Sequence, residues 1–319
     1  MALVCRRKLM MSRSVAQISI VIPVYNRADV VCRTLESVFD QTARPLHVVL
    51  VDNGSTDGSE ALVREWALRV GSDDFVVKVL CESERGAGNA RNRGLAEVET
   101  PWTMFFDSDD VMLPDHVSRV LRAIGGNPDV DVFGWDLRAF GPDGVERRLL
   151  FEPDSLPWHN LMHGAMSTLR YCARTELFRK AGGWCGGLST WDDIEFGTRI
   201  LLHRPKVMKL EGAPTAEIFY SPESQSGPSF AATAAKCLRA LDEIAKSYEA
   251  LGPLSHVRLK KAILAADCLR DGMESAPEIL RDVLACEPVL SNRVLYRLVY
   301  TYRLCGGRGA ARIVKPLLR

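Results

Sequence analysis

The sequence WTMFFDSDD at residues 102–110 places three carboxylates directly after a short apolar run. A run of this kind predicts a buried strand, and the acids that follow would then lie at its carboxyl end. Three similar apolar runs precede it, and segments with helical periodicity separate them. The runs are at residues 18–23, 46–51 and 75–80, and the helical segments are at 28–40, 57–70 and 86–98. This alternation predicts an α/β fold in which helices flank a mostly parallel sheet.

After residue 110 the pattern of predicted secondary structure changes twice. The pattern predicts first a hairpin and then two helices, at residues 130–151, 175–181 and 192–203. From about residue 230 the sequence becomes rich in alanine and leucine at helical spacing. We therefore expect three regions: an N-terminal extension at 1–16, an α/β domain at 17–228 and a helical C-terminal domain at 229–319.

The composition is typical of a folded protein in a reducing compartment. The 319 residues are 47% hydrophobic and 25% charged, and the net charge of +1 argues against nucleic acid as a partner. No apolar run approaches the roughly 18 residues that span a bilayer, and the basic N-terminus lacks the apolar stretch of a secretory signal. The nine cysteines are irregularly spaced without a CxxC pair, which favours a cytoplasmic location.

The acidic segment after the fourth predicted strand is the strongest indication of chemistry. Asp107, Asp109 and Asp110 repel one another, so each would raise the pKa of its neighbours unless a cation lies among them. Carboxylate oxygens suit Mg²⁺ or Mn²⁺, which bind through one or two carboxylates together with substrate phosphates. The alternative is a solvated acidic turn. Because ligands of open α/β sheets bind beyond the carboxyl ends of the strands, the position favours the metal interpretation.

The segment DNGSTD at residues 52–57 follows the second predicted strand. Asp52 would lie at the end of that strand, where a carboxylate can accept a hydrogen bond from a base imide or a ribose hydroxyl. Gly54 allows a sharp turn, and Asp57 with Glu60 predicts a capping box for the next helix. An ordinary turn with a helix cap is the alternative for the later residues of the segment.

Two further segments carry charge at the start of a predicted helix. Arg91 follows a glycine pair, and its guanidinium can match the oxygens of a diphosphate, although a surface ion pair is the alternative. Asp192 and Asp193 open the helix at 192–203, where one of them can act as a general base towards a hydroxyl group. Simple helix capping is the alternative, because acids are favoured at helix N-termini.

Several of these segments occur together in a known order. They are PVYN at 23–26, VDNGSTD at 51–57, GNARNRG at 88–94, FDSDD at 106–110, GGW at 182–184 and WDD at 191–193. The chain resembles the inverting glycosyltransferases of family 2, which have the GT-A fold, over about residues 17–225. The resemblance implies transfer of a sugar from a nucleotide-sugar, usually a UDP-sugar, with Mn²⁺ or Mg²⁺. The acceptor would be a glycan or a lipid-linked glycoconjugate, as in polysaccharide biosynthesis.

The resemblance assigns one group of residues to the donor. Pro23 and Tyr25 would line the nucleoside pocket, with Asp52 reading the base, and Arg91 belongs to the stretch that contacts the donor. Asn53 stands where family members frequently have a second acid, so this sequence departs from the pattern there.

A second group of residues would bind the metal and perform the transfer. Asp107 and Ser108 would lie near the ribose, and Asp109 is the expected direct metal ligand. Asp193 matches the catalytic aspartate of the family, and Asp192 stands where a glutamate is usual. Members often carry a histidine in the segment that is YSPESQS at 220–226 here. The corresponding contact would be absent, or Glu223 would supply it.

Two other classes of function are compatible with parts of the pattern. A non-catalytic nucleotide-sugar-binding subunit needs no general base, so the acids at 107–110 and 192–193 argue against it. A nucleotidyltransferase would need a glycine-rich, lysine-bearing phosphate loop after the first strand, and PVYNR at 23–27 is not such a loop.

The C-terminal segment 293–319 has an unusual charge pattern. It contains seven basic residues and no acids, interleaved with apolar side chains. A basic amphipathic helix can rest on an anionic membrane, which would place the protein at the cytoplasmic face near a lipid-linked acceptor. The alternative is a packed helix whose arginines pair with acids elsewhere.

Overall fold

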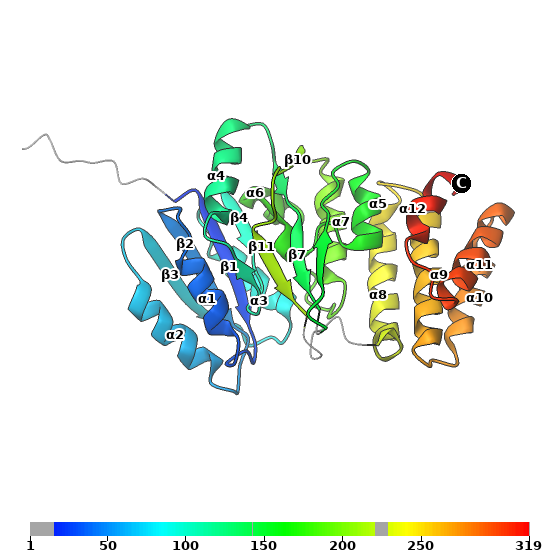
Figure 1. Ribbon diagram of the computed structural model, residues 1–319, viewed down its shortest axis with the longest axis horizontal. Helices are drawn as coiled ribbons and strands as arrows, with labels where there is room; N and C mark the ends of the chain where they lie inside the picture. Colours follow the sequence, from blue (N-terminus) through cyan, green and yellow to red (C-terminus); the bar gives the residue numbers. More distant parts are fainter. Residues whose placement is uncertain (1–15, 142, 221–228, 319) are drawn as a thin grey trace, which may run out of the picture.

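The computed structural model describes residues 16–141, 143–220 and 229–318, so the expected N-terminal extension lies outside it except for Ala16. A sheet-centred part and a helical part lie side by side along the longest axis (Figure 1). The main sheet has seven strands in the order β10-β6-β9-β4-β1-β2-β3. They are β1 (Ile18–Val24), β2 (Leu46–Asp52), β3 (Phe75–Cys81), β4 (Trp102–Phe105), β6 (Val132–Gly134), β9 (Tyr171–Arg174) and β10 (Val207–Lys209).

The main sheet is parallel except at β9, which runs antiparallel to both β4 and β6. β1 lies between β2 and β4, with Val24 opposite Asp52 and Val21 opposite Phe105. The carboxyl ends of these three strands therefore meet at one edge of the sheet. The predicted α/β fold with a mostly parallel sheet is confirmed.

Alternate side chains of the strands supply two separate cores. In β1, Ile18, Ile20 and Ile22 pack on one face of the sheet, whereas Val21 packs on the other. The first face is covered by α1 (Val31–Phe39), α2 (Ser59–Val70) and α4 (His116–Gly126). The second is covered by α3 (Ala87–Ala96), α6 (Thr175–Lys180) and α7 (Asp192–Leu202). Because both faces are covered, apolar residues predominate at successive positions of the central strands β1, β2 and β4.

A smaller sheet continues directly from the acidic segment. Its strands, in the order β5-β11-β7-β8, are β5 (Val111–Met112), β11 (Ala216–Phe219), β7 (Leu137–Phe140) and β8 (Glu146–Leu149). The expected hairpin is present as β7 and β8, but the earlier residues of its predicted first strand belong to β6 in the main sheet. Trp135 and Asp136 separate β6 from β7, and the buried carboxylate of Asp136 pairs with Lys209 of β10 and Arg148 of β8.

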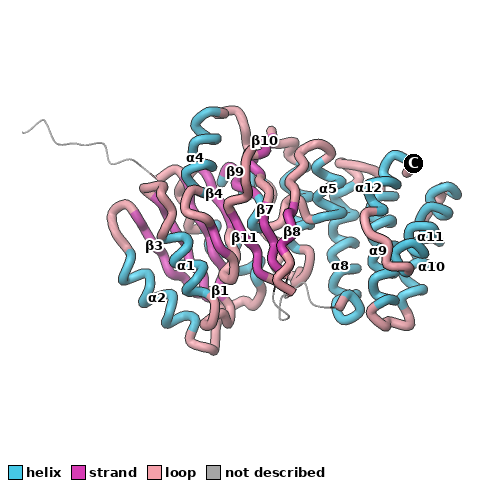
Figure 2. The backbone as a smooth tube through the Cα atoms, viewed as in Figure 1, coloured by secondary structure: helices cyan, strands magenta, loops and turns pink. Residues whose placement is uncertain are grey.

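The last part of the chain forms a helical region against the sheet-centred part (Figure 2). A third core joins its helices to α5 and to Ile194 of α7. The helices of the last part are α8 (Phe230–Tyr248), α9 (Ser255–Arg270), α10 (Ala276–Cys286), α11 (Leu290–Leu304), α12 (Ala310–Val314) and η2 (Lys315–Leu317). Earlier in the chain, α5 spans Leu156–His163 and the short helix η1 spans Thr168–Arg170. Within the described ranges, none of the helices has both the length and the apolarity that crossing a bilayer requires.

The predicted capping box at the start of α2 is wrong. Gly58, in a left-handed conformation, precedes the helix, and Asp57 accepts hydrogen bonds from the N–H groups of Ser59 and Ala28. Glu60 instead pairs with an arginine one turn further along α2. Asp57 therefore ties the start of α2 to the loop after β1, which is a contact that local sequence does not reveal.

Candidate active site

A cavity of about 790 Å³ opens at the edge where the carboxyl ends of β1, β2 and β4 meet. Its walls come from the loops after these strands, from the starts of α3 and α7, and from the end of α5, and one residue of α9 completes them. Of the ten residues that the sequence singled out for donor, metal or catalysis, nine line this cavity and Asp52 does not.

The three carboxylates after β4 have different partners. Asp107 Oδ1 accepts a hydrogen bond from Arg91 Nη2 at 2.8 Å, and Asp109 Oδ2 lies 3.3 Å from Arg27 Nε. Asp110 Oδ1 accepts from a backbone N–H of β11 at 2.9 Å. Burial, followed by repulsion from Asp107, raises the pKa of both Asp109 and Asp110. The segment is therefore no freely solvated turn, and further positive charge beside it would be stabilising.

Arg91 joins the two acidic segments. Its Nη1 donates to Asp192 Oδ2 at 3.2 Å, and its Nη2 donates to Asp107. The guanidinium lies over the ring of Trp184, 4.4 Å from the centroid, and only 8% of the side chain is exposed. Burial opposes the charge on Arg91, but the two carboxylates outweigh it and raise the pKa of the guanidinium. Arg91 is thus a buried link between the end of β4 and the start of α7.

Asp192 and Asp193 are the first residues of α7, after Trp191 in a left-handed conformation. Asp193 Oδ1 accepts a hydrogen bond from the Ile194 N–H at 2.8 Å, and no cation of the described chain forms an ion pair with it. Burial, together with repulsion from Asp192, raises the pKa of Asp193 to about 7. A carboxylate with this pKa can accept a proton from a hydroxyl group near neutral pH.

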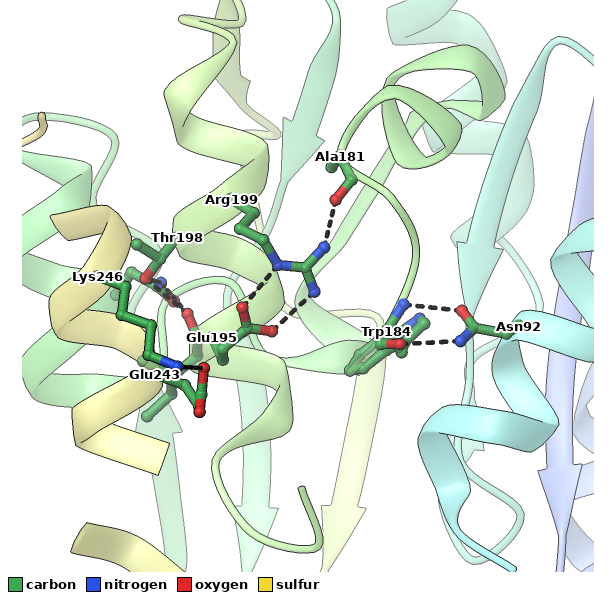
Figure 3. Close-up of polar contacts among 10 residues, drawn as sticks. Asn92, Ala181, Trp184, Glu195, Thr198, Arg199, Glu243 and Lys246 are labelled. Atoms are coloured by element: carbon green, nitrogen blue, oxygen red, sulfur yellow. Dashed lines mark hydrogen bonds and ion pairs between the residues drawn. The ribbon is translucent and has the colours of Figure 1, made fainter. Parts of the chain in front are cut away.

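Polar contacts hold the loop that carries Trp184 (Figure 3). The Asn92 side chain donates to the Trp184 carbonyl at 2.9 Å and accepts from the Trp184 N–H at 2.7 Å. On α7, Arg199 binds both carboxylate oxygens of Glu195, at 2.6 and 2.7 Å, and donates to the Ala181 carbonyl. The Trp184 ring packs against the guanidinium of Arg91, which joins the two acidic segments. The contacts that hold the Trp184 loop therefore help to position Arg91.

The end of the cavity near β1 and β2 is lined by Pro23, Tyr25 and Asn53. The guanidinium of Arg85 lies over the Tyr25 ring, 4.3 Å from its centroid. The Asn53 amide is fully used, because it donates to two backbone carbonyls and accepts from one N–H in the loop at residues 82–86. Asp52 accepts from two N–H groups of its own turn through Oδ2, while its buried Oδ1 has no partner in the described structure. Asn53 therefore shapes the wall, and Asp52 retains one unused acceptor.

The acids in the cavity fit a divalent metal that is held largely by its substrate. Among the described residues, no cluster of three or more His, Cys, Asp or Glu side chains could bind a metal on its own. Mg²⁺ and Mn²⁺ in phosphate-binding sites need only one or two carboxylates, because phosphate oxygens and water complete the coordination. Asp109 lines the cavity with a side chain that is 27% exposed and has a single ion pair. Glu223, the other expected contact, lies outside the described residues.

Four cationic side chains of the cavity were not predicted: Arg27, Arg85, Arg170 and Lys260. The first two adjoin predicted segments, because Arg27 follows PVYN and Arg85 precedes the glycine pair. Their positions beside those segments could have predicted that they line the cavity. Arg170 lies in η1 and Lys260 in α9, far along the chain from every such segment, so only tertiary packing brings them to the site.

Comparison with known proteins identifies the family. The model of the family described as "Glycosyl transferase family 2" matches residues 19–182, which is just over half of the chain. The chain therefore belongs to glycosyltransferase family 2.

Individual relatives match over shorter shares of their own length. An uncharacterized glycosyltransferase of Haemophilus influenzae is 28% identical over 194 residues, which are 58% of this chain and 62% of that protein. The succinoglycan biosynthesis protein ExoO of Rhizobium meliloti is 31% identical over 141 residues, 44% of this chain and 38% of that protein. The validoxylamine A glucosyltransferase of Streptomyces hygroscopicus subsp. limoneus is 28% identical over 222 residues, 58% of this chain and 48% of that protein. The matches thus span about one third to three fifths of such relatives.

Solved structures share the fold along nearly the whole chain. Residues 1–349 of Staphylococcus aureus TarS in complex with UDP superpose with a TM-score of 0.65 at 19% identity, covering 94% of this chain and 92% of that one. The mannosyltransferase PcManGT of Pyrobaculum calidifontis, in complex with GDP-Man and Mn²⁺, gives a TM-score of 0.55 at 18% identity, with 94% and 87% covered. The predicted GT-A-type architecture with a helical C-terminal region is thereby confirmed.

Proposed function

We propose that this protein is an inverting glycosyltransferase that moves a sugar from a UDP-sugar to a hydroxyl group of a glycan or lipid-linked acceptor. The observation that carries the proposal is the Arg91 bridge, because it sets the acids after β4 and the acids that open α7 against one cavity. A diphosphate and a hydroxyl group can then be bound within reach of each other. The TarS structures with UDP and with UDP-GlcNAc support the choice of donor.

Asp193 is the proposed general base. Its raised pKa lets the carboxylate take the proton of an acceptor hydroxyl while that oxygen attacks the anomeric carbon. The bond from the anomeric carbon to the acceptor oxygen forms on the face opposite the nucleotide, and the bond to the diphosphate breaks. One such displacement inverts the configuration, and it needs no covalent sugar–carboxylate intermediate. Asp192 holds Arg91, which faces the charge on the leaving diphosphate.

Asp109 is the proposed metal ligand. Bound Mn²⁺ or Mg²⁺ would neutralise the negative charge that develops on the leaving nucleotide. The complex of PcManGT with GDP-Man and Mn²⁺ supports the use of a divalent ion in this fold. The residues proposed to bind the nucleoside and ribose, or to shape their pocket, are Pro23, Tyr25, Asp52, Asn53, Asp107 and Ser108.

The surface of α11 supports a peripheral contact with the cytoplasmic face of an anionic membrane, where a lipid-linked acceptor would lie. One side of this helix packs in the third core through Tyr296 and Val299. The other side exposes an apolar stripe at four-residue spacing: Leu290, Val294, Leu298 and Tyr302. The Arg297 and Arg308 side chains are also exposed and form no ion pair with a described acid. Exposed apolar and cationic groups in one segment of the chain complement an anionic lipid layer.

Calorimetric titration with UDP-glucose and UDP-GlcNAc, with and without Mn²⁺, tests the donor site. We expect Asp109→Ala to abolish the Mn²⁺-dependent part of the affinity, because it removes the protein's carboxylate from the ion. Asp129→Ala changes an exposed acid outside the cavity and is the matched control. Normal Mn²⁺-dependent binding by Asp109→Ala would refute the assignment.

Turnover of radiolabelled donor separates the enzyme from the other two classes of function. Release of the labelled sugar to an acceptor or to water supports the transferase. Binding of the donor without turnover would favour a non-catalytic nucleotide-sugar-binding subunit, and release of pyrophosphate from a nucleoside triphosphate would favour a nucleotidyltransferase.

A further inference from the structure

Two cationic side chains that are buried or half-buried line the cavity without an acidic partner. Arg170 is 3% exposed and Lys260 is partly exposed, and neither forms an ion pair with a carboxylate in the described parts of the chain. By contrast, Arg27 and Arg91 in the same cavity are paired with acids. A cation withdrawn from water is costly unless an anion compensates it. This wall of the cavity therefore carries two cations that no ion pair neutralises.

Both cations contact the same short segment at the end of α5. Lys260 Nζ donates to the Met162 carbonyl at 2.9 Å, and Arg170 Nη1 donates to the Gly164 carbonyl at 3.1 Å. This segment lines the cavity as well. Lys260 Nζ lies 4.8 Å from the ring centroid of Trp191, close in sequence to Asp193, and Asp193 lines the same cavity as both cations.

Binding the last carbonyls of α5 uses only part of the donor capacity of the two side chains. Arg170 also donates to the Leu150 carbonyl, but its buried Nε has no partner among the residues described. Lys260 has three N–H groups, of which the contact with α5 uses one, and its ammonium lies 4.8 Å from the centroid of the Trp191 ring. Burial lowers the pKa of Lys260 to about 8 and that of Arg170 to about 10, as expected for cations without a counter-ion.

We propose that Lys260 and Arg170 bind an anionic substituent, a phosphate or a carboxylate group, on the acceptor sugar. This inference rests on the proposed function, because it places the acceptor at the wall beside Asp193. Phosphate and carboxylate oxygens accept charge-assisted hydrogen bonds from both ammonium and guanidinium groups. The helical region thereby supplies an acceptor-binding side chain from α9, and its packing on α5 and α7 holds that side chain at the site.

Calorimetry on the full chain with UDP and Mn²⁺ already bound tests this inference, because the donor end is then filled. The probes are glucose 1-phosphate and glucuronate as anionic sugars and glucose as the neutral one. We expect the anionic sugars to bind to the wild type and glucose to bind far more weakly. Lys260→Met should weaken the anionic probes about 10- to 100-fold, and Lys260→Arg should restore most of the affinity.

Lys261→Met is the matched control, because Lys261 lies on the same helix but pairs with Asp242 of α8. It should bind every probe as the wild type does. Unchanged UDP affinity in Lys260→Met shows that the variant is folded.

Equal affinity of wild type and Lys260→Met for the anionic sugars would overturn the inference, as would glucose binding as tightly as they do. In both cases the two cations would serve only to cap α5. Failure of UDP to bind would instead refute the proposed function. The same titrations on the UDP-free protein would then still decide whether Lys260 and Arg170 bind the anionic sugars.

Discussion

Replacing Asp193 by asparagine removes a charge while preserving the shape of the side chain, and so tests the proposed base directly. We expect sugar transfer to fall ~10²- to 10⁴-fold, the usual contribution of a general base. Affinity for the UDP-sugar with Mn²⁺ should stay unchanged, because donor and metal binding are assigned to other residues. In the wild type, transfer should rise with pH through about 7 as Asp193 loses its proton. The residual activity of Asp193→Asn should lack this dependence.

The same substitution has a consequence for stability whose sign follows from the pKa. Since the pKa of Asp193 rises from 3.8 to about 7 on folding, the native state holds this proton more tightly than the unfolded chain does. Stability therefore falls as pH increases between these values. Above about pH 7, the buried charge of Asp193 lowers the free energy of unfolding by at most about 4 kcal/mol. The charged groups that face Asp193 and share this effect are Asp107, Asp192, Arg91, Arg170 and Lys260.

We therefore expect Asp193→Asn to have a higher free energy of unfolding in urea than the wild type at about pH 8. The advantage should vanish below about pH 3, where both the native and the unfolded state of the wild type hold the proton. Asp282→Asn changes an exposed acid on α10 and is the control for both assays. An active Asp193→Asn protein with the wild-type pH profile would refute the role of Asp193 as the base. Equal stabilities at the higher pH would refute the reasoning from burial.

Two further substitutions test the supports of the site and its surroundings. Asn92→Ala leaves two backbone groups of the Trp184 loop without partners, so the free energy of unfolding in urea should fall by about 1–3 kcal/mol, and UDP-sugar affinity should fall with it. Asn127→Ala removes one hydrogen bond at the end of α4, so it should lower the free energy of unfolding and the UDP-sugar affinity less than Asn92→Ala does. Equal losses of affinity in the two variants would contradict the claim that Asn92 positions the site. Leu298→Ser should reduce co-sedimentation with phosphatidylglycerol vesicles several-fold without loss of stability, because the side chain is 62% exposed. Leu68→Ser, on an exposed leucine of α2, should leave sedimentation unchanged, and an unaffected Leu298→Ser protein would exclude membrane contact through α11.

Local sequence was sufficient for the architecture of the sheet-centred part. Apolar runs separated by helical periodicity predict buried parallel strands, because a strand covered on both faces can be apolar at every position. The rule that ligands bind at the carboxyl ends of such strands then favoured a binding role for Asp107, Asp109 and Asp110, whereas Tyr25 was assigned through the family resemblance. The helical region was equally readable from its alanine- and leucine-rich spacing, which begins near residue 230, where α8 starts.

Periodicity failed where a residue acts on a distant part of the chain. Asp57 has the spacing of a helix cap, yet it binds the loop after β1. The hairpin predicted at 130–151 is divided between two sheets, and Asp136 forms ion pairs with Arg148 and Lys209 at the division. Each outcome depends on a partner that lies elsewhere in the sequence, so the local pattern does not predict it.

The sequence by itself determined the α/β order of elements and the acidic loops of this protein, because both depend on residues that are close together along the chain. Tertiary structure alone decided which distant groups the cations of the cavity contact. Arg91 lies 101 residues from Asp192 in sequence, and Lys260 donates to the Met162 carbonyl from 98 residues away. Such contacts form when packing brings polar groups together, and the cost of burying a charge or a donor without a partner, rather than any local pattern, selects them.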